Sequence, residues 1–187
     1  MYKAGTRFIW LFTLLWGPGN SLTVKRGGSA GYVNVTAYSQ LPGVCNVDGF
    51  KDWFKVDKFC VQYFSKPLNF TDAEFSCRAK APGGHLVSVH SKNDNYDLLA
   101  IVTKFNPKNL RIWLGGYEFF KSGKFLWIDG TFWDYQIWTP GEPNNLFKGV
   151  EECVEMNWNH VAKWNDDSCA VKKNYICAFK RKGLMDE

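Results

Sequence analysis

The sequence predicts a single α+β domain that combines two helices with small antiparallel sheets, a long loop region and three disulfides. Three observations predict it. Two helical patterns lie in the first half of the chain, short aromatic strand-like segments surround and follow them, and six cysteines come after a segment typical of an export signal. At 187 residues, the chain has room for one ordinary domain with appendages.

Composition and charge exclude several classes of protein. Aromatic residues make up 17% of the chain and apolar residues 45%, which excludes disordered and collagen-like chains. The 23 Lys and Arg residues only slightly exceed the 18 Asp and Glu residues and form no basic run, so nucleic acid is not an expected partner. No apolar stretch reaches the roughly 20 residues that a membrane span requires. We therefore expect a soluble globular protein.

Residues 1–20 have the pattern of a secretory signal peptide. Lys3 and Arg7 precede an apolar run over 8–16, and small or polar residues follow over 17–21. The alternatives are an uncleaved anchor and an amphipathic N-terminus. Cleavage of this segment would make the mature protein secreted and extracellular, a setting in which cysteines form disulfides.

Residues 21–44 are expected to form a flexible leader. They are rich in Gly, Ser and Val and have no heptad repeat, so they predict no coiled-coil neck that would trimerise the chain. Asn34 and Asn69 begin Asn-x-Thr sequons and are candidate N-glycosylation sites. The folded domain is expected over 45–180, with a short tail over 181–187.

The domain is expected to begin with a hairpin and a helix. Short aromatic segments, Trp53-Phe54, Phe59-Cys60-Val61 and Tyr63-Phe64, predict a hairpin of short strands. Thr71 and Glu74 have the spacing of a capping box, which predicts the start of a helix. Pro82 and the glycines that follow it predict the end of this helix.

A second helix and several strands are expected after it. Ser91 with Asp94 can cap a helix whose apolar face ends near Pro107, and no further long helix is expected beyond that proline. A polar stretch that carries Gly and Pro lies over 129–150, and long loops inside compact domains are usually functional. The strand-like segments are 112–115, 125–127, 152–156 and 175–179.

Six cysteines can pair in 15 ways, and their spacing alone does not choose among these pairings. Pairing Cys45 with Cys60 and Cys153 with Cys169 would close short loops. These two local pairs would leave Cys77 and Cys177 for a bridge that spans about 100 residues.

Acidic and amide side chains cluster in the long loop and shortly after it, and this cluster predicts a calcium site. Ca²⁺ takes six to eight oxygen ligands from carboxylates, amides, backbone and water. Any one of these residues alone could be an ordinary turn residue. The three histidines, His85, His90 and His160, have no metal-like spacing, so they are expected to be structural or solvated. The candidate ligands are Glu142, Asn144, Glu151, Asn165 and Asp166.

Three motifs stand out in the second half of the chain: Glu142-Pro143-Asn144, Trp164-Asn165-Asp166 and Trp113-Leu114-Gly115-Gly116. They resemble signatures of the C-type lectin domain family, in particular of its mannose-type soluble members found in mucus, plasma and venom. The resemblance extends over about 45–180 and implies a C-type lectin-like fold. It also implies the disulfides Cys45–Cys60, Cys77–Cys177 and Cys153–Cys169.

The resemblance also implies a mechanism in which the bound calcium ion itself contacts the sugar. The five candidate ligands then bind both metal and carbohydrate: Glu142 and Glu151 accept hydrogen bonds from two neighbouring sugar hydroxyls, and the two asparagines donate. The Glu-Pro-Asn order resembles the mannose type, whereas Gln-Pro-Asp marks galactose binders. A cis peptide bond before Pro143 would point both flanking side chains at the metal. The implied partners are glycans with mannose-type vicinal hydroxyls, and the implied use is innate defence.

One calcium ion is expected rather than two. Many members of the family carry a second ion. Glu118 stands near one of the acids expected for it, but Ser122 and Asn145 stand where the pattern has acids. Glu152 would then be free, and Asp167 would be a surface charge or an outer-shell partner. The tryptophans are expected in the core rather than stacked on sugars.

No enzymatic activity is expected. The chain has no Gly-x-Ser-x-Gly elbow, no His-Glu-x-x-His motif and no phosphate-binding glycine loop. Glu142 and Glu151 could imitate a glycosidase pair, but a metal that holds both leaves no free general acid. The main alternative is a domain of the same fold that binds ice, as type II antifreeze proteins do, or binds a protein. A venom-type dimer is less favoured because no cysteine is left for a covalent link, so any oligomer would be noncovalent.

Overall fold

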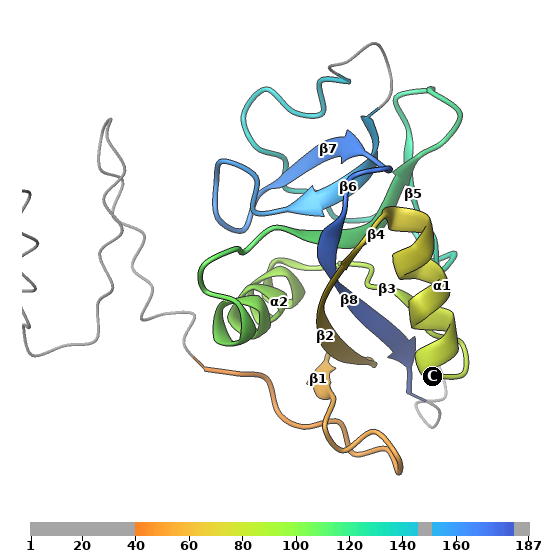
Figure 1. The fold of residues 1–187 in the computed structure, drawn as a ribbon, viewed down its shortest axis with the longest axis vertical. Helices are drawn as coiled ribbons and strands as arrows, with labels where there is room; N and C mark the ends of the chain where they lie inside the picture. The colour runs from red at the N-terminus through yellow and green to blue at the C-terminus, as the bar shows by residue number, and fades with distance from the viewer. Residues whose placement is uncertain (1–39, 146–150, 182–187) are drawn as a thin grey trace, which may run out of the picture. The chain divides into compact units, whose positions relative to one another are not determined.

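In the computed structural model, two helices lie on either side of one mixed sheet (Figure 1). The structure describes residues 40–145 and 151–181, which belong to a unit that runs from Tyr38 to Glu187. The expected signal peptide, the Asn34 sequon, residues 21–39 of the leader and residues 182–187 of the tail lie outside the described residues. The predicted α+β class and the two-helix fold are confirmed.

The sheet joins all the strands of the described part of the chain. Its order is β1-β2-β8-β4-β6-β7, with β3 paired to β8 and β5 paired to β4. The expected small antiparallel sheets are thus connected, because β4 and β8 pair in parallel while the other strand pairs are antiparallel. The strands are β1 (Phe54–Val56), β2 (Phe59–Leu68), β3 (His85–Leu86), β4 (Ile112–Glu118), β5 (Phe125–Trp127), β6 (Glu151–Met156), β7 (Trp164–Ser168) and β8 (Lys173–Lys180).

Strands β3 and β7 were not expected from the sequence. Strand β3 is only two residues long, and β7 consists of Trp164 followed by four polar residues, without the apolar alternation that marks a half-buried strand. Strand β7 forms because its backbone pairs with β6 along the antiparallel register. Its polar side chains bond to groups of other segments, for example Asp167 to Arg111 and Asp166 to the backbone of Asn144.

Helix α1 spans Phe70–Lys80 and is capped by Asn69, not by Thr71 as predicted. The Asn69 side chain accepts a hydrogen bond from the backbone N–H of Asp72 at 2.8 Å. Asn is at least as good an N-cap as Thr, so the earlier residue starts the helix. Glu74 does not close a capping box either, because its buried carboxylate accepts from the backbone N–H of Leu86 at 2.9 Å.

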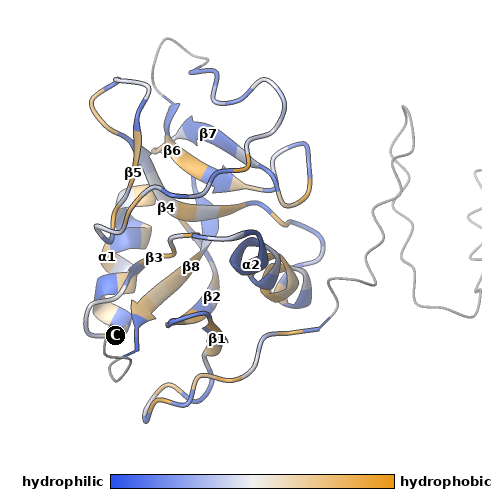
Figure 2. Ribbon diagram, turned by 180° about the vertical axis from the view of Figure 1, so that it is seen from behind, coloured by the Kyte–Doolittle hydropathy of each residue, from blue (hydrophilic) through white to orange (hydrophobic). Residues whose placement is uncertain are grey.

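Helix α2 spans Lys92–Phe105, and Ser91 caps it as predicted, accepting from the backbone N–H of Asp94 at 3.1 Å. The two helices contribute to different parts of the core. Leu98 and Ile101 of α2 belong to one cluster of buried residues, and Phe70 and Ala73 of α1 belong to a second cluster. Strand β8 is hydrophobic along much of its length (Figure 2). Its residues alternate between the two clusters, with Ile176 in the first and Cys177 in the second.

Three disulfides connect the elements, and they are the pairs that the family resemblance implies. Cys77–Cys177 links α1 to β8, Cys45–Cys60 links the start of the domain to β2, and Cys153–Cys169 links β6 to the residue after β7. The last bridge lies beside the strands that carry the candidate ligands, so it fixes the end of the sheet on which the site depends.

Candidate functional site

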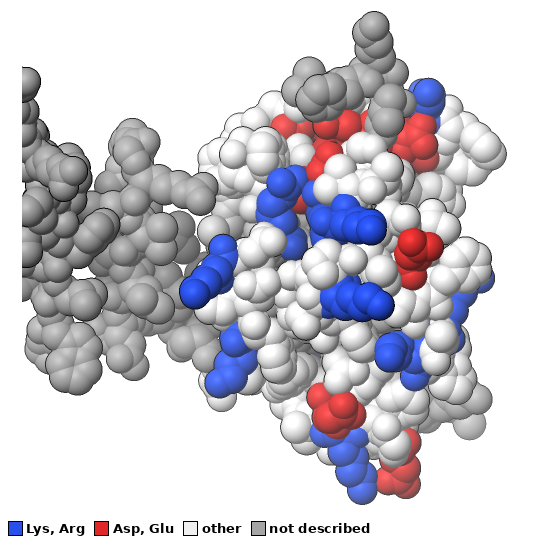
Figure 3. All heavy atoms as spheres, in the orientation of Figure 1, with Lys and Arg blue, Asp and Glu red and all other residues white. Residues whose placement is uncertain are grey.

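The candidate ligands come from a loop and from two paired strands. Glu142 and Asn144 lie in the loop after β5, Glu151 begins β6, and Asn165 and Asp166 lie in β7. The strands β6 and β7 pair antiparallel at the upper end of the molecule in Figure 1. Acidic side chains gather at this end in the space-filling view (Figure 3).

Asp166 attaches the loop to β7. Its side chain is fully buried, and its two carboxylate oxygens accept from successive backbone N–H groups, those of Asn144 at 3.1 Å and Asn145 at 3.0 Å. Hydrogen bonds from N–H groups to a carboxylate are stronger than those between neutral groups. One buried side chain therefore holds the Glu-Pro-Asn segment against the sheet.

Glu142 lies between two other carboxylates. Its backbone N–H donates to the Thr139 carbonyl at 2.9 Å, and the peptide bond between Glu142 and Pro143 is cis, as expected. Burial raises the pKa of Glu142 to about 7, with further contributions from Asp166, which acts by hydrogen bonding and by repulsion, and from the charge of Glu151. Its Oε2 atom is buried without a hydrogen-bond partner. This corner of the protein therefore has more negative charge and more acceptor oxygens than its own donors satisfy.

A hard cation fits this set of residues. Among the described residues, no three His, Cys, Asp or Glu side chains are grouped so that they alone could hold a metal ion. A site here must therefore also use amide oxygens, which the exposed Asn144 and the buried Asn165 can supply. Carboxylate and amide oxygens are the ligands that Ca²⁺ takes, and the unpartnered Glu142 oxygen is an acceptor that such an ion would satisfy.

Asn165 is held by a glutamate that the sequence analysis missed. Its Nδ2 donates to Glu155 Oε1 at 3.0 Å, and Glu155 is fully buried. Arg111 donates to both Glu155 oxygens, at 2.8 and 2.6 Å, and the Lys173 ammonium lies 3.3 Å from the same carboxylate. The signal in the sequence is a Glu between Val154 and Met156 in the apolar second half of β6, because a charge that faces the interior there needs buried partners.

Asp167 belongs to the same cluster and is not a solvated surface charge. It accepts from Arg111 at 3.0 Å and from the buried Lys173 at 2.5 Å. The two acidic side chains, on β6 and β7, are therefore each paired with the same two basic side chains. The alternative expectation, that Asp167 is an outer-shell partner of the metal, stays a prediction.

The residues considered for a second ion are already hydrogen-bonded to protein groups. Glu118 Oε1 accepts from the Gly123 N–H at 2.7 Å. The surroundings of the Asn145 amide place its nitrogen toward the Glu151 carbonyl, at 2.8 Å, and toward Glu118 Oε2, at 3.3 Å. An amide that presents its nitrogen to these acceptors does not present an oxygen ligand there.

Five of the tryptophans that the structure describes belong to the core or pack against it. Trp113, Trp127 and Trp164 are buried, and Trp133 and Trp138 pack against the core at its edge. The Trp133 ring lies 4.3 Å from that of Trp127 and 5.8 Å from that of Trp164, so the aromatic rings pack mainly on one another.

A serine, a histidine and an aspartate form a chain of contacts that superficially looks catalytic. His90 Nδ1 lies 2.8 Å from Asp134, and its Nε2 lies 3.0 Å from Ser88 Oγ. Ser88 is only 5% exposed, however, and its hydroxyl donates to Asp129 at 2.5 Å. A nucleophile must be accessible and must pass its proton to the base, so this arrangement serves the structure. His85 likewise contacts buried Glu74, at 2.7 Å.

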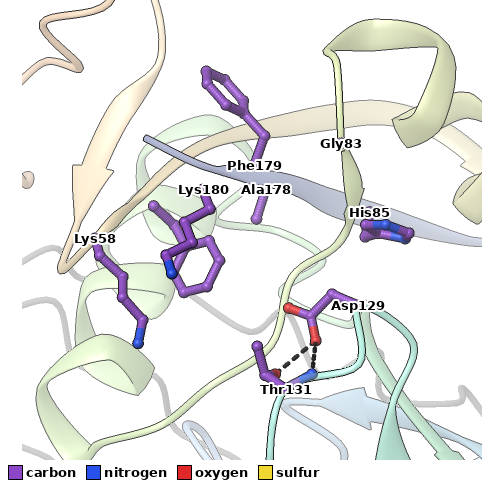
Figure 4. Close-up of a pocket in the computed structure, with 9 residues that line it drawn as sticks. Lys58, Gly83, His85, Asp129, Thr131, Ala178, Phe179 and Lys180 are labelled. Carbon is purple, nitrogen blue, oxygen red and sulfur yellow. Dashed lines mark hydrogen bonds between the residues drawn. The ribbon is translucent and has the colours of Figure 1, made fainter. Parts of the chain in front are cut away.

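A small pocket of about 190 Å³ lies away from the candidate ligands (Figure 4). Its lining combines apolar side chains with side chains of both charges. Asp129 accepts from the Thr131 backbone and hydroxyl at 3.0 and 2.6 Å, so its carboxylate is engaged within the protein. The lining residues are Lys58, Phe59, Gly83, His85, Asp129, Thr131, Ala178, Phe179 and Lys180.

Comparison with known proteins identifies relatives along most of the domain. Residues 66–179 match the Lectin C-type domain. A lectin of Pleurodeles waltl is 36% identical over 74% of this chain and 80% of its own length. A mannose-binding isoform of a C-type lectin from Notechis scutatus scutatus is 35% identical over 70% of this chain and 82% of its own. A galactose-binding isoform from Pseudechis porphyriacus is 32% identical, with the same coverage of both chains.

Solved structures with a similar fold are found as well. The carbohydrate-recognition domain of cow CD23, solved in the presence of an oligosaccharide, has a TM-score of 0.61 and 28% identity over 74% of this chain and all of its own. The herring type II antifreeze protein has a TM-score of 0.60 and 29% identity over 70% of this chain and 98% of its own. In the part of the chain that the structure describes, neither helix has the length and apolar character needed to cross a membrane.

Proposed function

The chain belongs to the C-type lectin domain family, and we propose that it is a secreted, calcium-dependent carbohydrate-binding protein. The observation that carries the proposal is the acidic corner in which Glu142 lies beside Glu151 and Asp166 with one buried oxygen unpartnered. A divalent cation would neutralise this charge. The family is non-enzymatic, and the buried, engaged Ser88 agrees with the expectation that the chain is not an enzyme.

Five side chains would bind the ion: Glu142, Asn144, Glu151, Asn165 and Asp166. When bound, calcium supplies the direct contact to two neighbouring sugar hydroxyls. Around it, the two glutamates accept hydrogen bonds from these hydroxyls and the two asparagines donate. Asp166 has a further role, because it already holds the Glu-Pro-Asn segment through two backbone N–H groups. We propose one ion, since Glu118 and Asn145 are engaged with protein groups.

We propose that the sugar is of the mannose type. Overall identity does not decide this, since relatives named as mannose-binding and galactose-binding are 35% and 32% identical to the chain. The direction of the hydrogen bonds supports the mannose type. When ionised, Glu142 can only accept while Asn144 can donate, and this Glu-Pro-Asn order resembles that of mannose-type members of the family.

The direct test is retention of the refolded mature protein on mannose and galactose columns in calcium, followed by elution with a chelator. Retention on mannose with release by the chelator is the expected result. Acid should also release the protein, because carboxylates must be deprotonated to hold the ion. Passage through both columns, or retention in the presence of chelator, would contradict the proposal.

Exchanging donor and acceptor tests the roles of the two loop residues. The double variant Glu142→Gln with Asn144→Asp should shift preference from mannose toward galactose, because it reverses the hydrogen-bond order. Glu152→Gln is the matched control, since Glu152 neighbours the site but is not a proposed ligand. Unaltered mannose preference in the double variant would show that Glu142 and Asn144 do not contact the sugar.

Ice binding is the second candidate, and the similarity in structure to the herring type II antifreeze protein favours it over the binding of a protein ligand. An ice-binding protein would use a flat surface in place of sugar hydroxyls, with or without the ion. Thermal hysteresis in a cooled solution would support it, and sugar retention without hysteresis would exclude it. Binding of a protein ligand is the function that remains if neither activity is found.

Glycosylation and assembly follow as smaller proposals. Asn69 is a candidate glycan site whose carbonyl oxygen caps α1, and an N-linked glycan leaves that oxygen in place. Mass spectrometry before and after enzymatic deglycosylation tests this. All six cysteines are paired, so any oligomer is noncovalent and should survive neither dilution nor denaturant in light scattering.

A further inference from the structure

We propose that Glu155 is a positioning residue that sets which way the side-chain amide of Asn165 points. The inference about the amide rests on observed contacts, and its consequence for ligand binding rests on the proposed function. Glu155 is not among the proposed ligands. It acts through Asn165, which lies directly opposite it in the β6–β7 pair.

The two side chains meet in the interior of the protein. Glu155 is 0% exposed and Asn165 is 6% exposed, and the Nδ2–Oε1 distance is 3.0 Å. Solvent therefore cannot easily take the place of either partner. The contact holds the amide at the strand position next to Asp166, the residue that holds the Glu-Pro-Asn segment.

Two cations contact the Glu155 carboxylate. Arg111 donates to both of its oxygens at 2.8 and 2.6 Å, and Lys173 lies at 3.3 Å. Asp167 contacts the same two cations, at 3.0 and 2.5 Å, so the four side chains form one cluster. Both Glu155 oxygens therefore already act as hydrogen-bond acceptors toward Arg111.

Because both Glu155 oxygens accept from Arg111, the Glu155 side chain meets Asn165 as a hydrogen-bond acceptor. Of the two ends of the Asn165 amide, only the nitrogen can face it, because the oxygen would be repelled. The amide is planar, so Oδ1 must then point away from Glu155, and one N–H remains for another partner. Glu155 thereby presents an oxygen to the metal and a donor to a sugar hydroxyl, which are the two groups that the site requires from Asn165.

The test reverses the donor in this pair. In Glu155→Gln, the oxygen of the new side chain is expected to face Arg111, so its NH₂ faces Asn165 and turns the Asn165 oxygen inward. Calcium affinity, measured by calorimetry, should fall by about tenfold or more, the usual effect of losing a residue that orients a ligand. Adding Asn165→Asp to this variant should restore calcium affinity to within about threefold, because the new carboxylate can accept from the glutamine NH₂ and still offer an oxygen to the metal. Sugar binding should stay lost, since an aspartate side chain donates no N–H.

The control is Lys173→Met. It disturbs the same charge cluster but leaves the contact between Glu155 and Asn165, so calcium and sugar affinities should stay within about threefold of wild type at a temperature where the variant is folded. Equal losses in Lys173→Met and Glu155→Gln would overturn the proposal, because they would show that the cluster acts only through stability. Wild-type calcium affinity in Glu155→Gln, or no recovery in the double variant, would also overturn it.

A separate measurement keeps this inference distinct from the proposed function. If the wild-type protein binds no calcium, the proposed function fails, but the orientation of the amide can still be read by NMR in ¹⁵N-labelled protein with chelator. The Asn165 side-chain NH₂ should exchange slowly with solvent in wild type and faster in Glu155→Gln. Equally fast exchange in both proteins would show that Glu155 does not hold the amide.

Discussion

Asn95 joins helix α2 to the strand that carries two of the proposed ligands, and its removal is the sharpest test of the fold. Its side chain is 0% exposed. Its Nδ2 donates to the Ala162 carbonyl at 2.9 Å, and its Oδ1 accepts from the Trp164 indole N–H at 2.8 Å. Trp164 is itself fully buried and directly precedes Asn165.

The cost of Asn95→Ala follows from these contacts. The truncation leaves the indole N–H and the Ala162 carbonyl buried without partners, at about 1–3 kcal/mol each. The void left by the amide adds to this cost. We expect a loss of about 4 kcal/mol, a large part of the roughly 5–15 kcal/mol that stabilises a typical domain.

The assay is equilibrium unfolding in urea with the disulfides intact, followed by tryptophan fluorescence. Asn93→Ala is the matched control, because Asn93 is exposed on the same helix and the chemical change is the same. The control should change the free energy of unfolding by less than about 0.5 kcal/mol. A loss below about 1 kcal/mol for Asn95→Ala would refute the reasoning, since it would mean that water or a shifted side chain satisfies both orphaned groups.

Three further predictions concern backbone packing, pH and helix capping. Gly115→Ala should destabilise by about 1–3 kcal/mol and lower the melting temperature, because its Cβ would lie 2.5 Å from the backbone oxygen of Leu86; an unchanged melting temperature would contradict this. Burial, and then the charge of Asp94, raises the pKa of Asp97 above 3.8, so its charged form is disfavoured in the folded state. The stability that Asp97 contributes is fully present below pH 3.8 and falls as pH rises through its folded pKa. Asp97→Asn should therefore be more stable than wild type at neutral pH in chelator, with the gain vanishing in acid; a gain that is independent of pH would rule out this cause. Asn69→Ala should cost about 1 kcal/mol in the same urea assay through loss of the cap of α1, and no loss would show that another group caps the helix.

Local signals in the sequence predicted the elements that depend on local contacts. The apolar spacing and the Ser91 cap located α2, and Pro107 lies just beyond its end. The first helix was located to within two residues at its start, and its cap was misassigned because both Asn69 and Thr71 suit that position. The motif residues of the candidate site were also readable, since oxygen ligands in clustered spacing stand out without any structure.

The sequence by itself determined the class of fold, the two helices, the six cysteines and the residues that can bind a hard cation, because each depends on side-chain chemistry or on neighbours a few positions away. Only the tertiary structure decided which distant partners meet. Strand β8 pairs in parallel with β4, Asn95 reaches Trp164, and Glu155 lies between Arg111 and Asn165. These choices depend on which polar groups are buried together and must satisfy one another, and no local pattern in the chain encodes that condition.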